Sequence, residues 1–235
     1  GYILTRSGFS LNVIKKIIPS TSNLINCSKL GSNVKITDIG IFVTDPEYAN
    51  KGAVFLFYIT AIGSNIWLDN PVQITPTNYT NKNDGMLFGY DIDATNNILL
   101  VSALSEQNTS TTGTIYYFSI NYNTKYISQV NRIENPSTIS KKFGNNVLLY
   151  NQIYGVISCP DETVDDNTVT KTDAGCVYIC DNTNKNILNN IYNIDNTDEL
   201  YFGTSISSYM PYSIISETGN SEGNIYVYKV TGTIW

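Results

Sequence analysis

The chain has 235 residues and a formal net charge of −6, with 14 Lys and Arg side chains scattered along it. A nucleic-acid binder needs a basic stripe that displaces counterions from phosphates, so this charge distribution excludes that class. No run of about 18 apolar residues exists, which excludes membrane insertion through an apolar helix. The sequence contains no histidine, which excludes a Ser-His-Asp or Cys-His catalytic arrangement within the chain.

A repeated pattern runs through nearly the whole chain. Each copy opens with a large apolar residue and a glycine, and these openings recur every 55–59 residues, at Leu30-Gly31, Phe88-Gly89, Phe143-Gly144 and Phe202-Gly203. After a short apolar run, a second glycine starts a further apolar run, at Gly52-Ala53-Val54-Phe55, Gly113-Thr114-Ile115-Tyr116, Gly175-Cys176-Val177-Tyr178 and Gly223-Asn224-Ile225-Tyr226. A repeat of this kind indicates a series of similar structural units. We expect Phe88, Phe143 and Phe202 to be buried at equivalent points of successive units, as Leu30 is in the first.

The predicted elements are β-strands, because Tyr, Ile, Val, Thr and Phe are abundant and no long stretch has a helical apolar period. In chain order we expect a partial unit at residues 1–19 and further units at residues 30–75, 87–134, 143–194 and 201–235. Each full unit is expected to be a four-stranded antiparallel sheet. In the second unit we expect the strands at Leu87–Ala94, Asn97–Ala103, Gly113–Ser119 and Lys125–Ile133.

The third run of each unit is apolar on both faces. In Ile115-Tyr116-Tyr117-Phe118, successive side chains point to opposite sides of a strand and all are large. A strand buried on both faces needs another sheet on each side, as in the blades of a β-propeller. The glycine of each opening is expected where the backbone packs too closely for a side chain.

The order of Phe-Gly, short apolar strand, variable loop and Gly-x-Val/Ile-Tyr resembles the FG-GAP repeat family, which includes the propeller heads of integrin α chains. The best match is the second unit, from Phe88 to Phe118. The small-residue element of that family is degraded here to Asp45-Pro46, Ser102-Ala103 and Cys159-Pro160. The resemblance implies a β-propeller, commonly of seven blades.

The two ends of the chain predict an incomplete ring. Gly1-Tyr2-Ile3-Leu4-Thr5 resembles the third strand of a blade, with an outer strand following at Val13–Ile18. The last residues, Gly232-Thr233-Ile234-Trp235, resemble Ser64-Asn65-Ile66-Trp67, where an outer strand begins. We therefore expect four to five blades cut from a longer propeller, with the ring completed by further blades or by another subunit. The isolated piece is expected to associate through its open ends.

Metal binding has weak support in the sequence. FG-GAP repeats often carry calcium in a loop of the type Asp-x-Asp-x-Asp-Gly-x-x-Asp, and the nearest approach is Asp91-Ile92-Asp93-Ala94-Thr95-Asn96-Asn97-Ile98-Leu99. Its glycine is missing and its last position is Leu99, so we expect a plain turn, with no metal and no cofactor. The acidic segment Asp161–Asp166, closed by Asp173, is either a cation or partner site or a solvated charge run, and we favour the charge run.

The cysteines allow two interpretations. If the strands that carry Cys159 and Cys176 pair, these two side chains face each other at disulfide distance; the alternative is that all four thiols are reduced and buried. Cys176 and Cys180 are expected on one face of a strand, too far apart to bond. Zinc is not expected, because the chain lacks histidine and close cysteine pairs.

Catalytic residues are not expected. Ser105-Glu106 and Ser216-Glu217 fall in loops or at strand ends with no base nearby, and sequence alone cannot place two carboxylates across a cleft for glycoside hydrolysis. Tyr116, Tyr178, Tyr226 and Tyr228 could form a sugar-stacking ladder, but their place in the repeat predicts packing between blades.

The predicted function is non-catalytic binding, adhesion or structural assembly on an exterior surface, either of a cell or of a virion. A protein or glycan partner is expected on the face that carries the loops Pro46–Lys51, Leu104–Thr112, Pro160–Ala174 and Thr218–Glu222. We call this the loop face. The alternatives are a carbohydrate-binding propeller and a non-catalytic propeller within a larger enzyme, and the fold does not decide between them.

Overall fold

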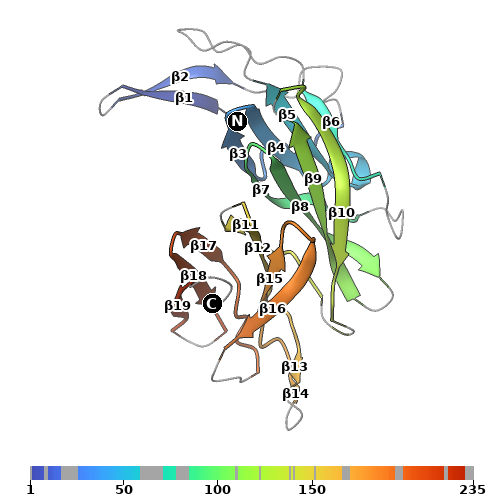
Figure 1. Cartoon of the computed structure of the whole chain (residues 1–235), viewed down its shortest axis with the longest axis vertical. Helices are drawn as coiled ribbons and strands as arrows, with labels where there is room; N and C mark the ends of the chain where they lie inside the picture. Colours follow the sequence, from blue (N-terminus) through green and yellow to red (C-terminus); the bar gives the residue numbers. More distant parts are fainter. Residues whose placement is uncertain are drawn as a thin grey trace.

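The computed structural model describes most of the chain, namely residues 2–7, 10–16, 26–58, 71–77, 85–108, 111–121, 123–137, 139, 141–150, 152–165, 170–193, 198–219 and 222–230. The fold is all-β: four small antiparallel sheets follow one another along the chain as the blades of a β-propeller. In Figure 1 the blades form an arc that is open on its left side. The predicted fold class is confirmed.

The first two blades each contain four strands. The first consists of β3 (Val34–Thr37), β4 (Gly40–Asp45), β5 (Ala53–Tyr58) and β6 (Val72–Ile74). A single short helical turn, η2 (Tyr48–Asn50), lies between β4 and β5. The second blade consists of β7 (Phe88–Ala94), β8 (Ile98–Asn108), β9 (Thr111–Asn121) and β10 (Tyr126–Glu134).

The last two blades follow the same order. The third consists of β11 (Val147–Tyr150), β12 (Tyr154–Cys159), β15 (Cys176–Asp181) and β16 (Asn186–Tyr192), with a small hairpin, β13 (Val164–Asp165) and β14 (Thr170–Lys171), inserted before its third strand. The fourth consists, in its described residues, of β17 (Ile206–Tyr209), β18 (Tyr212–Glu217) and β19 (Asn224–Lys229).

An N-terminal hairpin precedes the blades. Its strands are β1 (Tyr2–Ser7) and β2 (Ser10–Lys16), which pair antiparallel. The second strand of the hairpin thus begins earlier than the predicted Val13–Ile18, whose last two residues lie outside the described part of the chain. Within the described residues, no helix has the length and hydropathy that crossing a bilayer requires.

The Phe-Gly openings join each blade to the one before it. Phe88, Phe143 and Phe202 are fully buried, and their backbone amides donate hydrogen bonds of 2.9, 3.2 and 3.0 Å to carbonyl oxygens of the preceding blade. These carbonyls directly precede the third-strand glycines, Gly52, Gly113 and Gly175, which have positive φ. A Cβ atom on any of these three glycines would overlap the backbone of the inserted phenylalanine.

The tightest backbone approach is therefore at the glycine that leads the third strand. The sequence assigned it to the glycine of the opening, and Gly89 is indeed close to the preceding blade, since a Cβ atom on it would lie 3.0 Å from the carbonyl oxygen of Ala53. The prediction and the structure differ because the backbone of the next blade's phenylalanine lies directly against each third-strand glycine. Only glycine combines this contact with a φ near +100°.

The apolar core is divided into clusters that lie between neighbouring blades. One joins the first and second blades around Phe88, one joins the second and third around Phe143, and one joins the third and fourth around Phe202. The phenylalanine rings meet Tyr116, Tyr178 and Tyr226 edge-on at 5.4–5.5 Å. The predicted packing of these tyrosines between blades is confirmed for Tyr116 and Tyr178, which are buried, while Tyr226 and Tyr228 are half-buried.

Leu30 differs from the three phenylalanines. It is only partly buried and packs at the edge of a cluster within the first blade. The prediction that Leu30 is buried like Phe88 was wrong, because in the described residues no earlier blade receives it. Gly31 is accordingly exposed, and no atom of the described residues lies within 4 Å of its Cβ position.

Candidate functional site

The loop face combines a cleft with two projecting hairpins. Between Leu104 and Thr112 the structure has strand and not the predicted loop, since β8 and β9 stay paired as far as Asn108 and Thr111. The segment Pro160–Ala174 holds the small β13–β14 hairpin. Pairing strands beyond the body of a blade satisfies backbone groups that a free loop would leave to water.

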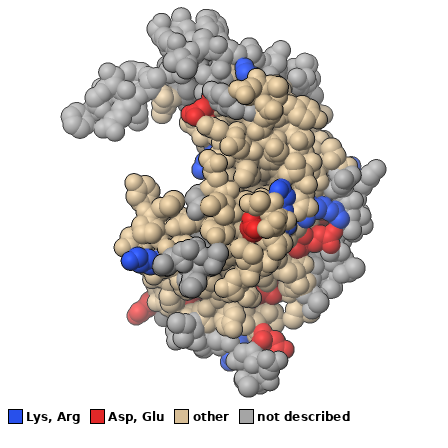
Figure 2. All heavy atoms as spheres, in the orientation of Figure 1, with Lys and Arg blue, Asp and Glu red and all other residues tan. Residues whose placement is uncertain are grey.

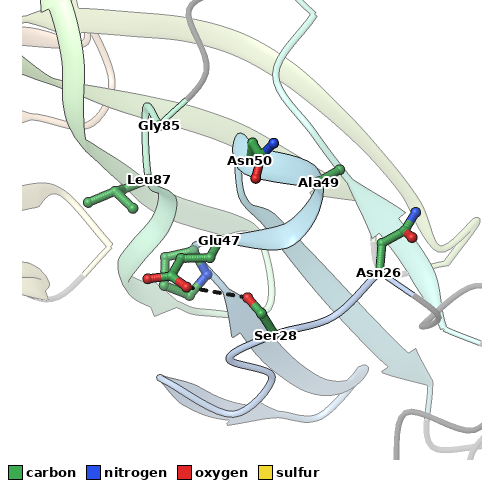
Figure 3. Close-up of a pocket in the computed structure, with 8 residues that line it drawn as sticks. Asn26, Ser28, Glu47, Ala49, Asn50, Gly85 and Leu87 are labelled. Atoms are coloured by element: carbon green, nitrogen blue, oxygen red, sulfur yellow. Dashed lines mark hydrogen bonds between the residues drawn. The ribbon is translucent and has the colours of Figure 1, made fainter.

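The cleft lies where the β4–β5 connection meets the segment that enters β7 (Figure 3). Its volume is about 760 Å³, within the range typical of ligand pockets. Eight described residues line it: Asn26, Ser28, Pro46, Glu47, Ala49, Asn50, Gly85 and Leu87. The lining mixes amide, hydroxyl and carboxylate groups with small apolar surfaces and contains no aromatic ring.

Two carboxylates hold one wall of the cleft in place. Buried Asp45 accepts backbone hydrogen bonds from Ser28 at 2.7 Å and from Lys29 at 3.0 Å. Glu47 accepts a longer bond from the Ser28 hydroxyl, drawn in Figure 3, and lies 2.5 Å from the Lys29 ammonium. Because Lys29 and Glu47 are both exposed, their ion pair adds little stability, and its effect is to orient the carboxylate at the rim of the cleft.

The backbone around the cleft is strained. Ala49, Asn50 and Leu87 have φ values of 48°, 62° and 56°, in a region that alanine and leucine rarely adopt. Tyr48 anchors the turn by packing edge-on against Phe55 at 5.2 Å between ring centroids. The positive φ of Leu87 belongs to the repeat, because Lys142 and Tyr201 share it at the same place before Phe143 and Phe202. The turn at Ala49–Asn50 is the strained segment that the cleft adds, and strained backbone held by its surroundings is common at binding sites.

In the second, third and fourth blades, a buried glutamate lies near the base of the connection between the second and third strands. Glu106, Glu162 and Glu217 each accept a hydrogen bond from the hydroxyl of a third-strand tyrosine, at 2.6, 3.0 and 3.2 Å. The partners are Tyr116, Tyr178 and Tyr226. Burial, and then the hydrogen bond to Glu106, raises the pKa of Tyr116 well above its usual value, so the phenol stays a donor.

The sequence did not reveal these Glu–Tyr pairs. Glu106 and Glu217 were expected only as members of Ser-Glu pairs in loops or at strand ends. Glu217 is indeed the last residue of β18, whereas Glu106 lies within β8, and both are buried. The available signal was a glutamate that recurs before each Gly-x-Val/Ile-Tyr run. The first blade breaks this pattern, because Phe55 has no hydroxyl group to donate.

A second recurring contact also escaped the sequence analysis. In each blade a hydroxyl oxygen of the second strand accepts a hydrogen bond of 2.9–3.0 Å from a backbone amide near the start of the first strand. The residues that carry these hydroxyl groups are Thr44, Ser102, Ser158 and Ser216. Three of these four residues are fully buried beneath the following blade, and Ser216 is not.

The segment nearest to a calcium loop is structural. Asp91 and Asp93 lie within β7 and not in the predicted turn. Each accepts a 2.7 Å hydrogen bond from a β11 backbone amide, that of Val147 or Leu149. Asn33 also donates to Asp91, and Lys35 pairs with Asp93. These carboxylates therefore connect three blades.

The acidic segment is more ordered than a solvated charge run. Glu162 is buried on Tyr178, and Asp161 lies 2.7 Å from the Lys142 ammonium. Val164–Asp165 pairs with Thr170–Lys171, while Asp166 lies outside the described residues. The favoured interpretation was wrong for Glu162, because the tyrosine hydroxyl of the third strand provides a buried partner that composition cannot show.

Cys159 and Cys176 are direct cross-strand partners, as the pairing argument required. Both are buried free thiols, as is Cys180, which lies in the same apolar cluster. Burial raises the pKa of Cys159 and Cys176 far above the usual range, and that of Cys180 to about 12, so these thiols stay protonated. Such thiols are poor nucleophiles. In the described part of the chain, no group of three His, Cys, Asp or Glu side chains is arranged to hold a metal.

No protein-family model matches this chain, and no curated protein is significantly similar to it. The resemblance to FG-GAP repeats therefore stays a prediction that rests on the repeated residues. The fold defines the class as a β-propeller, and the function has to be argued from the surface.

Proposed function

We propose that this chain is a non-catalytic binding module that holds a protein partner on its loop face. The observation that carries the proposal is the cleft of about 760 Å³, whose lining combines polar groups with the turn of positive φ at Ala49–Asn50. A preformed cleft loses little conformational entropy when it binds, which favours recognition.

The chemistry of the cleft favours a polypeptide over a sugar. Asn26, Ser28 and Asn50 offer amide and hydroxyl groups suited to a peptide backbone, and Glu47 offers one carboxylate at the rim. Sugar sites usually stack an aromatic ring on the apolar face of the sugar, but Tyr48 is turned away to pack on Phe55. The partner is therefore proposed to be a protein segment with free polar backbone groups or a basic side chain.

Carbohydrate binding is the second candidate. It is favoured by Tyr209 and Tyr212, which expose their rings beside a depression of about 420 Å³ on the fourth blade. The resemblance to integrin-like propellers and the low charged fraction support an exterior location for either function.

Site-specific photo-crosslinking tests the first candidate. A photoreactive amino acid at Asn26, in the cleft lining, is compared with one at Tyr126, an exposed position on the outer strand β10. In an extract of the source organism, we expect one adduct from position 26 and none from position 126. Excess unmodified chain should abolish the adduct, and so should Glu47→Lys, which reverses the charge at the rim.

Equal crosslinking from both positions, or an adduct indifferent to Glu47→Lys, would contradict a partner in the cleft. A glycan array provides the opposing test. Binding that is lost in Tyr209→Ala and kept in Glu47→Lys would overturn the protein-partner proposal in favour of the second candidate.

A further inference from the structure

The outward face of the fourth blade repeats the chemistry of a buried face. In the third blade, the face that turns toward the fourth presents two tyrosines and three aliphatic side chains: Tyr150, Tyr154, Val156, Val177 and Ile179. The residues in the same register of the fourth blade are Tyr209, Tyr212, Ile214, Ile225 and Val227. Each tyrosine is matched by a tyrosine, and each aliphatic residue by an aliphatic residue.

The two faces differ in exposure. In the third blade Tyr150, Val156, Val177 and Ile179 are at most 4% exposed, because the fourth blade covers them. The corresponding side chains of the fourth blade are between 44% and 89% exposed, with Tyr209 at the upper limit. Figure 2 shows this part of the molecule beside the notch of the arc, where few charged atoms lie. A soluble protein rarely leaves such a face uncovered without a partner.

No described residue fills the backbone site for a Phe-Gly opening on this blade. Gly52, Gly113 and Gly175 are each crossed by the phenylalanine of the next blade. Gly223 holds the same place in the fourth blade and has a positive φ, and among the described atoms the one nearest to its Cβ position is a carbonyl oxygen of Glu217, in its own blade, at 3.3 Å. Ser216, the cross-strand partner of Ile225, is partly exposed. Its counterparts in the first three blades, Thr44, Ser102 and Ser158, are fully buried.

The chain's own first blade does not supply the missing partner. The residues that would have to cover the fourth blade correspond to Ile215, Tyr226 and Tyr228. In the first blade these positions are Val43, Phe55 and Phe57, which are at most 6% exposed and thus already covered. A second copy that docked through its first blade would have to displace that cover.

We propose that the face formed by Tyr209, Tyr212, Ile214, Ile225 and Val227 receives a further blade that opens with an aromatic residue and glycine, carried by the same polypeptide. The three occupied interfaces support this choice, because each is filled by the next blade in chain order. The proposal is independent of the loop-face cleft, which lies at the other end of the arc, between the first two blades.

The reading frame that encodes the chain gives the first test. Phe88, Phe143 and Phe202 follow Gly52, Gly113 and Gly175 by 36, 30 and 27 residues. We therefore expect the frame to continue past Trp235 and to encode an aromatic-Gly pair about 27–36 residues after Gly223, followed by a Gly-x-Val/Ile-Tyr run. A stop codon directly after Trp235, or a continuation without such a pair, would overturn the proposal.

Comparison of two protein products gives the second test. Ile225→Glu places a charge on the exposed face, and Tyr126→Glu is a matched control on an outer strand. In the 235-residue chain, neither change should move the urea midpoint. In the longer native product, Ile225→Glu alone should lower the midpoint of the last two blades clearly, since the charge would be buried.

An unchanged midpoint in the longer product would overturn the proposal. So would a discrete dimer of the 235-residue chain that Ile225→Glu dissociates, because that result would assign the face to a second copy. Sedimentation velocity over a hundredfold range of concentration distinguishes such a dimer from the open-ended association expected of an uncovered face.

Discussion

Replacing Phe143 by alanine tests how the blades are joined. The ring is fully buried, and it meets Tyr178 edge-on with 5.4 Å between ring centroids. Truncation of a buried phenylalanine costs about 3–5 kcal/mol, of which an aromatic pair supplies roughly 0.5–1.5 kcal/mol. A loss of this size is a large share of the total stability of an ordinary domain, about 5–15 kcal/mol.

Urea denaturation followed by tyrosine fluorescence measures the loss. Leu30→Ala is the matched control, because Leu30 opens the first blade in the same way but is only partly buried. We expect it to cost less than half as much as Phe143→Ala. Hydrogen exchange should show where the structure loosens, with amides of β9 and β12 exchanging before those of β4, since blades contact mainly their neighbours. An unchanged midpoint for Phe143→Ala, or an equal loss for both variants, would refute this interlocking of blades.

Three further outcomes are expected from the same denaturation assay. Gly113→Ala should lower the free energy of unfolding by about 2–5 kcal/mol, because the new Cβ atom overlaps the Phe143 backbone and the φ is positive. Gly85→Ala, with positive φ but no described atom near its Cβ position, should lower it by about 1–2 kcal/mol. Equal losses would contradict the close approach of Phe143 to Gly113. Tyr116→Phe should cost about 1–3 kcal/mol by removing a donor to buried Glu106, and a neutral result would show that this bond is dispensable. Burial raises the pKa of Asp91 from 3.8 to about 6. The folded chain therefore binds this proton more tightly than the unfolded chain, and about 3 kcal/mol of stability, fully present below pH 4, should be lost as the pH rises to 6 and beyond. Asp91→Ala should abolish that slope, and an unaltered slope would contradict the assignment.

Much of the fold could be predicted from the sequence because the same order of apolar runs and glycines occurs four times, and each copy predicts the same sheet. The strands of the second blade fall within a few residues of their predicted bounds, since large side chains on both faces of Ile115-Tyr116-Tyr117-Phe118 require neighbouring sheets. The wrong bounds occur where pairing continues beyond the apolar run. Thr111 and Asn108 carry polar side chains, yet their backbones still pair.

The candidate site was less predictable, because it depends on contacts between segments distant in sequence. Nothing in Pro46–Lys51 indicates that Leu87 lies across a cleft from it, or that Ala49 adopts a left-handed backbone. Asp91 resembled a remnant of a cation loop, and only its distance to Val147 shows that it joins two blades. Local sequence reports which residues a strand buries, but not which neighbour satisfies a buried polar group.

Cysteine labelling at four equivalent positions tests the central claim, that three blade interfaces are filled and the fourth is open. The variants are Val54→Cys, Ile115→Cys, Val177→Cys and Ile225→Cys, which occupy the same place in successive blades. Alkylation of the folded 235-residue chain, read by mass spectrometry of the individual peptides, should leave the first three variants protected at the new thiol and modify the Ile225→Cys variant rapidly. Equal protection at all four positions would contradict the open face, and rapid modification at Val177→Cys would contradict the blade order itself.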